Sequence, residues 1–123
     1  MAVRVCEKSS MSTNLPIDVE HLHQISEGDT EFELELLQVF VEDTQEHIAK
    51  ARLAISLQDY QLLSREAHHM KGSSGNVGSH AMQALAHELE NLSKQQSIEQ
   101  TDAILVQLEQ QLLQVQDFMK TYA

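Results

Sequence analysis

Two adjacent histidines, His68 and His69, stand just before a Lys-Gly pair in the stretch EAHHMKGSSGNVGSH, residues 66–80. Near neutral pH, imidazole can present an unprotonated nitrogen as a nucleophile while an acceptor holds the N–H of its other nitrogen. A nearby cation such as Lys71 would partly neutralise the oxygens of a phosphoryl group on that nitrogen. A histidine that carries a phosphoryl group is one interpretation of these residues, and an ordinary surface His beside a Lys is the other.

Helical phase separates the two histidines. At about 100° per residue, four side chains fall within about 40° of one another and form a stripe that must face a core: Leu63, Ala67, Met70 and Ser74. His68 lies about 140° from Leu63, on an outward face, and His69 lies on the other flank. The neighbours of His68 on the outward face are small or cationic: Ser64, Lys71, Gly72 and Gly75.

Two glycines lie on the same face as His68. Glycine inside a helix costs roughly 1 kcal/mol relative to alanine, so Gly72 and Gly75 require a reason. Close approach by another molecule is one reason, and preparation of the helix end is another. The pattern alone leaves both interpretations open.

The elements that position this stretch are all predicted to be helices. A short lid helix is expected from Pro16 or Asp18 to Gly28, and a long helix from Asp29 or Thr30 to about Leu57. A third helix is expected from Asp59 to about Gly75, and a fourth is capped by Ser79. A capping box of Ser97 and Gln100 opens the last helix. No segment has a strand signal. We therefore expect an all-α antiparallel up-down four-helix bundle with an additional short N-terminal helix.

Length and composition agree with one helical domain. The chain has 123 residues, 41% of them hydrophobic and 22% charged. Residues 1–14 are predicted to be a flexible N-terminal tail and 15–123 the bundle domain. The net charge of −11 argues against nucleic acid and anionic membrane surfaces as partners. With the single Cys6 and no expected signal peptide or membrane span, a cytoplasmic location is expected.

The segment AHHMKGSSGNVGSHAMQALAHELENL resembles the signature of the histidine-containing phosphotransfer (HPt) domain family. That signature has a small residue and His, two further residues, Lys-Gly, small residues, a Gly turn, and a helix that ends in Leu-Glu or Leu-Gln. The matching anchors are Ala67, His68, Lys71, Gly72, Ser73, Ser74, Val77, Gly78, Leu85, Leu89 and Glu90, with Met70 where Leu or Ile is more common. The motif covers about 64–94, and the expected helix lengths extend the resemblance to about 16–121.

The resemblance implies a role for individual residues. His68 would be the phosphoacceptor, Lys71 its electrostatic partner, and Gly72 the gap that admits a partner's active site. Glu90 takes the position from which a Gln or Glu accepts the imidazole N–H, and Lys94 would be a second cation. For Glu90 and Lys94, ordinary solvated surface residues remain the alternative.

The resemblance also implies partners. The chain would be a histidine phosphotransfer protein of a multistep two-component phosphorelay, carrying phosphoryl groups to and from aspartates of receiver domains in response regulators or hybrid sensor histidine kinases. Ser64, His68, Gly72 and Gly75 would form the docking surface of an expected monomer. No cofactor of its own is expected, and Mg²⁺ would be bound by the receiver. Because there is no nucleotide-binding glycine loop, we expect a phosphocarrier without kinase activity.

Two other functions remain as alternatives. A non-catalytic helical adaptor could dock receivers without exchanging phosphate. A di-metal site could use the motifs Glu20-x-x-His23 and Glu66-x-x-His69, although Glu66 and His69 are expected on a flank of their helix. The sequence HELEN at 87–91 lacks the second His of a zinc-protease motif. The remaining histidines are interpreted as surface or boundary residues: His21, His47, His80 and His87.

Overall fold

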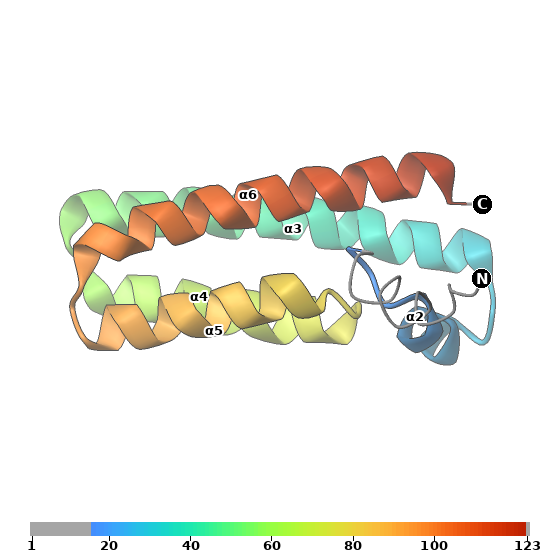
Figure 1. Ribbon diagram of the computed structural model, residues 1–123, viewed down its shortest axis with the longest axis horizontal. Helices are drawn as coiled ribbons and strands as arrows, with labels where there is room; N and C mark the ends of the chain where they lie inside the picture. Colours follow the sequence, from blue (N-terminus) through green and yellow to red (C-terminus); the bar gives the residue numbers. More distant parts are fainter. Residues whose placement is uncertain (1–15, 123) are drawn as a thin grey trace, which may run out of the picture.

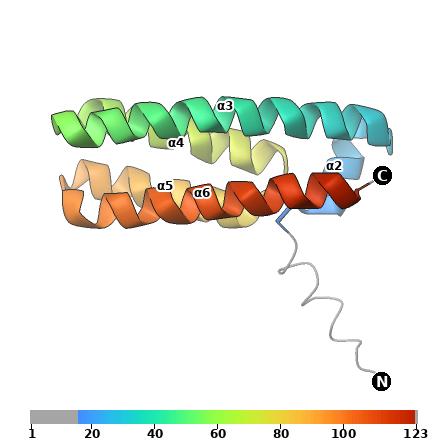
Figure 2. The same ribbon diagram turned by 90° about the horizontal axis from the view of Figure 1, so that it is seen from above.

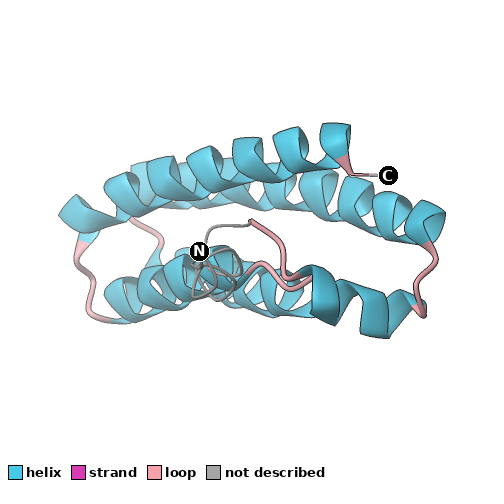
Figure 3. Ribbon diagram, turned by 45° about the vertical axis from the view of Figure 1, so that its right-hand side comes forward, coloured by secondary structure: helices cyan, strands magenta, loops and turns pink. Residues whose placement is uncertain are grey.

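The computed structural model describes residues 16–122, and within that range it contains five helices and no strands. The helices are α2 (Val19–Ser26), α3 (Thr30–Leu57), α4 (Tyr60–Asn76), α5 (His80–Lys94) and α6 (Ile98–Thr121). Successive long helices run in opposite directions, joined by short turns (Figures 1 and 3). The prediction of an all-α up-down four-helix bundle with a short N-terminal helix is confirmed.

The four long helices form a ring in which α3 lies beside α4 and α6, and α5 lies beside the same two helices. α3 and α6 have 28 and 24 residues, whereas α4 and α5 have only 17 and 15. The longer pair therefore overhangs the shorter one. α2 lies beneath this overhang, beyond the turn between α4 and α5 (Figures 1 and 2).

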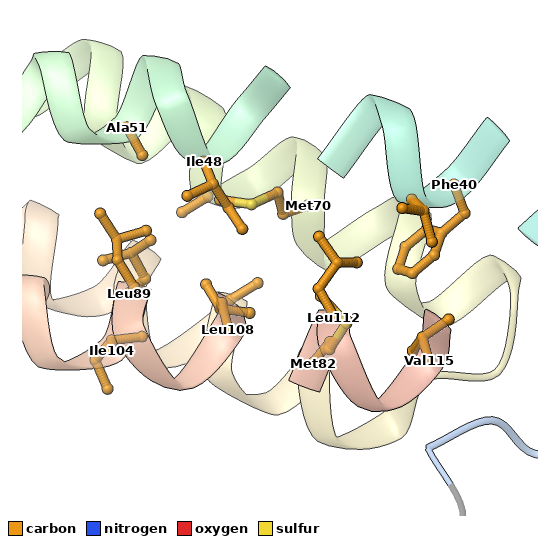
Figure 4. Packing of buried hydrophobic residues seen from close by; sticks show 14 of the residues in the cluster. Phe40, Ile48, Ala51, Met70, Met82, Leu89, Ile104, Leu108, Leu112 and Val115 are labelled. Atoms are coloured by element: carbon orange, nitrogen blue, oxygen red, sulfur yellow. The ribbon is translucent and has the colours of Figure 1, made fainter. Parts of the chain in front are cut away.

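The core lies along the axis of the bundle and receives apolar side chains from each long helix. Figure 4 shows Phe40 and Ile48 of α3, Met70 of α4, Met82 of α5 and Leu108 of α6 among the side chains of this buried cluster. The stripe predicted on α4, from Leu63 to Ser74, has no solvent-exposed surface at any of its four residues. The opposite face of α4 must consequently turn outward.

Side-chain caps mark the first three helix starts but not the last two. Asp18, Asp29 and Asp59 each accept the backbone N–H three residues on. Ser79 and Ser97 take the N-cap positions without making a side-chain cap bond, so the predicted capping box at Ser97 is wrong. Backbone bonds hold that turn instead: the N–H of Ser97 donates to the carbonyl of Leu92 at 3.0 Å.

The turn between α4 and α5 contacts Asp18, the residue just before α2. α4 ends at Asn76, one residue beyond the expected end, and Gly78 follows with a φ of 81°. A Cβ at Gly78 would come within 3.1 Å of Asp18, whose N–H donates to the Gly78 carbonyl at 2.8 Å. Glycine is therefore needed here both for its backbone conformation and for this close approach.

The predicted N-terminal tail, residues 1–14, lies outside the described residues, and Cys6 lies there with it. Among the helices between residues 16 and 122, none is both long and apolar enough to cross a membrane.

Candidate functional site

His68 occupies the outward face of α4, opposite the buried stripe, and its side chain is 69% exposed. Its Nδ1 lies 3.1 Å from Oε2 of Glu90 on α5. A carboxylate can only accept a hydrogen bond, so Nδ1 carries the proton of the neutral ring. Nε2, which has no hydrogen-bond partner among residues 16–122, then presents a lone pair to solvent.

Glu90 contacts the other charged residues of the site and is only 7% exposed. Lys71 donates from Nζ to Oε1 at 2.9 Å, and Nζ of Lys94 lies 3.6 Å from Oε2. The hydrogen bond from Lys71 lowers the pKa of Glu90 most strongly, with help from His68 and Lys94 and against the opposing effect of burial. Glu90 is therefore a carboxylate at neutral pH.

The packing of α5 against α4 explains the position of Glu90. Met82, Ala86 and Leu89 form the buried stripe of α5, and Glu90 follows directly at the edge of that stripe. Because α5 runs beside α4, this edge lies against the helix that carries His68. The lysines come from both helices, Lys71 from α4 and Lys94 from α5, so the site spans the α4–α5 pair.

The two glycines on the face of His68 have different surroundings. A Cβ added at Gly72, one turn beyond His68, would have no heavy atom within 4 Å. A Cβ at Gly75 would come within 2.6 Å of Nε2 of Gln83 on α5. Gln83 is exposed and flexible, so a Cβ at Gly75 would require only that the end of this side chain move, whereas a Cβ at Gly72 would meet nothing.

An open hollow lies on the other side of His68, lined by Gln61, Ser64, Arg65, His68 and Glu90. Sequence reasoning placed Ser64 here but missed Gln61 and Arg65. Gln61 lies seven residues and Arg65 three residues before His68, and residues at these spacings share a helix face, so the sequence did contain the signal. Arg65, Lys71 and Lys94 together give this region a local positive character in an acidic chain.

His69 points away from this site, as its helical phase predicted. Its Nε2 lies 3.2 Å from Oδ2 of Asp43 on α3, on the opposite flank of α4. The four histidines interpreted as surface or boundary residues are half-buried, as His21 and His47 are, or exposed, as His80 and His87 are.

The alternative di-metal arrangement does not form among residues 16–122. Glu20 is exposed, and Nδ1 of His23 bonds to Glu33 at 2.6 Å. Glu66 was expected on a flank but is only 8% exposed, because it pairs with His47 of α3. The two Glu-x-x-His motifs therefore have separate partners.

Comparison with protein families gives a match to the Hpt domain over residues 35–118. The chain is also 26% identical, over 109 residues, to the phosphorelay intermediate protein rdeA of Dictyostelium discoideum. That alignment covers 85% of this chain but 43% of the relative, so the chain spans less than half the length of this curated protein.

Two solved structures share the fold. Histidine-containing phosphotransfer protein B (HptB) of Pseudomonas aeruginosa PAO1 superposes with a TM-score of 0.79 and 27% identity, covering 85% of this chain and 91% of that one. The HPT domain of a sensor hybrid histidine kinase from Shewanella gives a TM-score of 0.67 with the same coverage. At 21% identity, the second likeness concerns the fold alone.

Proposed function

Because the chain belongs to the Hpt domain family, we propose that it is a histidine phosphotransfer protein whose His68 carries the phosphoryl group. The observation that supports this most directly is the asymmetry of the His68 ring. Nδ1 is held by a buried carboxylate, while Nε2 has no hydrogen-bond partner among residues 16–122 and belongs to a side chain that is 69% exposed. A nucleophile held in one tautomer and accessible from outside is what phosphoryl transfer requires of the acceptor.

The proposed transfer uses Nε2 as the nucleophile. Its lone pair attacks the phosphorus of an aspartyl phosphate on a receiver domain, the N–P bond forms, and the aspartate oxygen leaves with the electrons of the broken P–O bond. The imidazole ring becomes positively charged as the N–P bond forms. Glu90, 3.1 Å from Nδ1, would stabilise that charge, and Lys71 would be shared with the phosphoryl oxygens.

The reverse reaction would pass the group to a second receiver aspartate. Mg²⁺ bound by the receiver would supply charge stabilisation on the phosphoryl oxygens, and no cofactor of this chain enters the proposal. The chain would thus be a phosphocarrier between receiver domains of response regulators or hybrid kinases, and it would not use ATP. Ser64 and Gly72 would lie in the docking surface, with Gln61 and Arg65 added to it.

The test uses receiver domains that carry labelled aspartyl phosphate. Each is incubated with the wild-type chain, with His68→Gln and with His69→Gln as the matched control. We expect acid-labile, alkali-stable label on the wild type and the His69 variant, and none on His68→Gln. Label that persists on His68→Gln would disprove the assignment, and receivers that bind the wild type without ever labelling it would favour the adaptor.

A further inference from the structure

Three potential metal ligands converge on the flank of α4 that faces away from Glu90. They are Asp43 and His47 of α3 and His69 of α4, and one ligand atom from each lies within 4.8 Å of the others. Nε2 of His47 is 3.4 Å from Oδ1 of Asp43, and Nε2 of His69 is 3.2 Å from Oδ2 of the same carboxylate. Both imidazoles therefore direct the same nitrogen at one carboxylate.

The helices fix this arrangement. Asp43 and His47 are four residues apart on α3 and share a face, and the neighbouring α4 brings His69 against them. The rings of His47 and His69 lie close, with centroids 3.9 Å apart. The side chain of His47 is 13% exposed, whereas those of Asp43 and His69 are 38% and 52% exposed, so solvent reaches the group through Asp43 and His69.

Glu66 determines which nitrogen of His47 faces Asp43. It accepts a hydrogen bond from Nδ1 of His47 and is itself buried. With the proton on Nδ1, Nε2 presents its lone pair to Oδ1 of Asp43, so two electron-pair donors face each other. A cation between them would turn this unfavourable contact into two bonds. A carboxylate that holds the outer nitrogen of a ligating histidine is a recurrent feature of metal sites.

We propose that Asp43, His47 and His69 form a binding site for one Zn²⁺ or a similar divalent transition metal. Zinc binds at about 2.0–2.1 Å from histidine nitrogen and in tetrahedral geometry, which separates its ligand atoms by about 3.4 Å. Nε2 of His47 lies 3.4 Å from Oδ1 of Asp43, and Nε2 of His69 lies 3.2 Å from Oδ2, so each ring has about this separation from a different oxygen of the same carboxylate. A small rotation of the carboxylate would present one oxygen to an ion held by both rings. Two imidazoles select such metals over Mg²⁺ and Ca²⁺, and the open side leaves the fourth position to water.

The inference does not depend on the proposed phosphotransfer. The metal would join α3 to α4, and its ligands do not include His68 or Glu90. Because it would bind the folded chain only, zinc should raise the thermal stability of the protein. This effect can be measured with no receiver domain present.

The test is a titration of the tag-free full-length chain with Zn²⁺, followed by calorimetry, and with Co²⁺, followed by its visible absorption. We expect one zinc per chain, a tetrahedral Co²⁺ spectrum, and a rise in the melting temperature with zinc. His47→Ala and His69→Ala should each weaken binding at least about tenfold, as loss of a ligand does. Two controls should bind as the wild type does: His87→Ala, at an exposed histidine on α5, and His68→Gln.

His69→Ala is the more informative variant, because removal of His47 would leave the buried Glu66 without its partner and could unfold the chain. His69 is 52% exposed, so its loss should leave the fold intact. The proposal is wrong if the wild type binds no zinc, if the folded His69 variant binds it as tightly as the wild type, or if only His68→Gln loses binding.

Discussion

At the scale of single residues, Glu90 links His68, the proposed phosphoacceptor, to Lys71 and Lys94. The carboxylate is buried, and its negative charge is maintained because hydrogen bonding by Lys71 lowers its pKa. Lys71 is therefore already ordered beside His68 before any phosphoryl group arrives, which reduces the entropy lost when it contacts that group. Glu90 thus has two functions, since it sets the tautomer of His68 and it positions a cation.

Replacement of Glu90 by Leu should remove both functions, whereas removal of an exposed carboxylate elsewhere on α5 should remove neither. Loss of the carboxylate frees Nδ1 of His68 and Lys71 together, so we expect transfer to slow by about 10- to 100-fold, the usual effect of removing such an orienting acceptor. Single-turnover rates measure this, and ¹⁵N shifts of His68 should show a mixture of tautomers. Glu88→Leu, at an exposed position on the same helix, is the control. Equal rates in both variants would contradict the role given to Glu90.

Gly72→Gln should affect stability and transfer in opposite directions. The helix gains about 0.5–1 kcal/mol because glycine is a poor helix former, and a Cβ here meets no neighbour within 4 Å. A long side chain beside His68 should nevertheless obstruct the receiver and slow transfer. Melting temperature and single-turnover rate are the two measurements. The control is Ala103→Gln, at an exposed position on α6. Unchanged transfer would refute close approach at Gly72.

At the scale of elements, periodicity in the sequence was sufficient to predict the buried face of α4 and, with it, the outward position of His68. The pairings between helices were not predictable in the same way. Glu66 was expected on a flank, yet it is buried because His47 of α3 faces it. The pattern likewise did not indicate that the end of the Gln83 side chain of α5 lies beside Gly75. Such contacts depend on how the helices are aligned along one another, which the pattern of a single helix does not encode.

Another buried carboxylate lies beneath the overhang of α3 and α6. Glu33 of α3 has no exposed surface and accepts hydrogen bonds from Ser26 and His23 of α2 and from Tyr122 after α6. Burial would raise the pKa of Glu33, but the three hydrogen bonds outweigh it and lower the pKa. Burial and Glu33 together raise the pKa of Tyr122 to about 12. The network thus fastens α2 and the end of α6 to α3.

Tyr122→Phe should destabilise the bundle by about 1–3 kcal/mol at pH 7, the usual cost of removing one partner of a buried polar group. Urea unfolding measures the loss, and Tyr60→Phe is the matched control. Because the folded-state pKa of Glu33 is lowered, its bonds stabilise fully above its ordinary value of 4.5 and are lost as the pH falls through the lowered value. The difference between Tyr122→Phe and wild type should therefore shrink in acid. A difference that is independent of pH would exclude Glu33 as the partner.

At the scale of the whole molecule, the charge is large and unevenly distributed. The net charge is −11, yet three of the six Lys and Arg residues between 16 and 122 surround His68: Arg65, Lys71 and Lys94. Arg52 instead joins α3 to α6. Its Nη2 lies 2.7 Å from Oε1 of Glu109, and its Nη1 lies 3.1 Å from Oδ1 of Asp102. Lys120 lies 3.7 Å from Asp117, but between residues 16 and 122 there are 18 Asp and Glu for the six Lys and Arg, so most exposed carboxylates repel one another.

This self-repulsion should make the chain more stable in salt at neutral pH. Between about 0.01 M and about 1 M NaCl the Debye length falls from about 30 Å to about 3 Å, so repulsion among exposed carboxylates is screened. The exposed Arg52 pairs lose strength too, but such pairs contribute only about 0–1 kcal/mol each. We therefore expect the melting temperature at pH 7 to rise by several degrees across this range.

The same titration near the pI of about 4.9 is the control, because there the net charge is close to zero while unspecific effects of salt persist. A melting temperature that falls with salt at pH 7 would mean that ion pairs such as Arg52–Glu109 outweigh the repulsion.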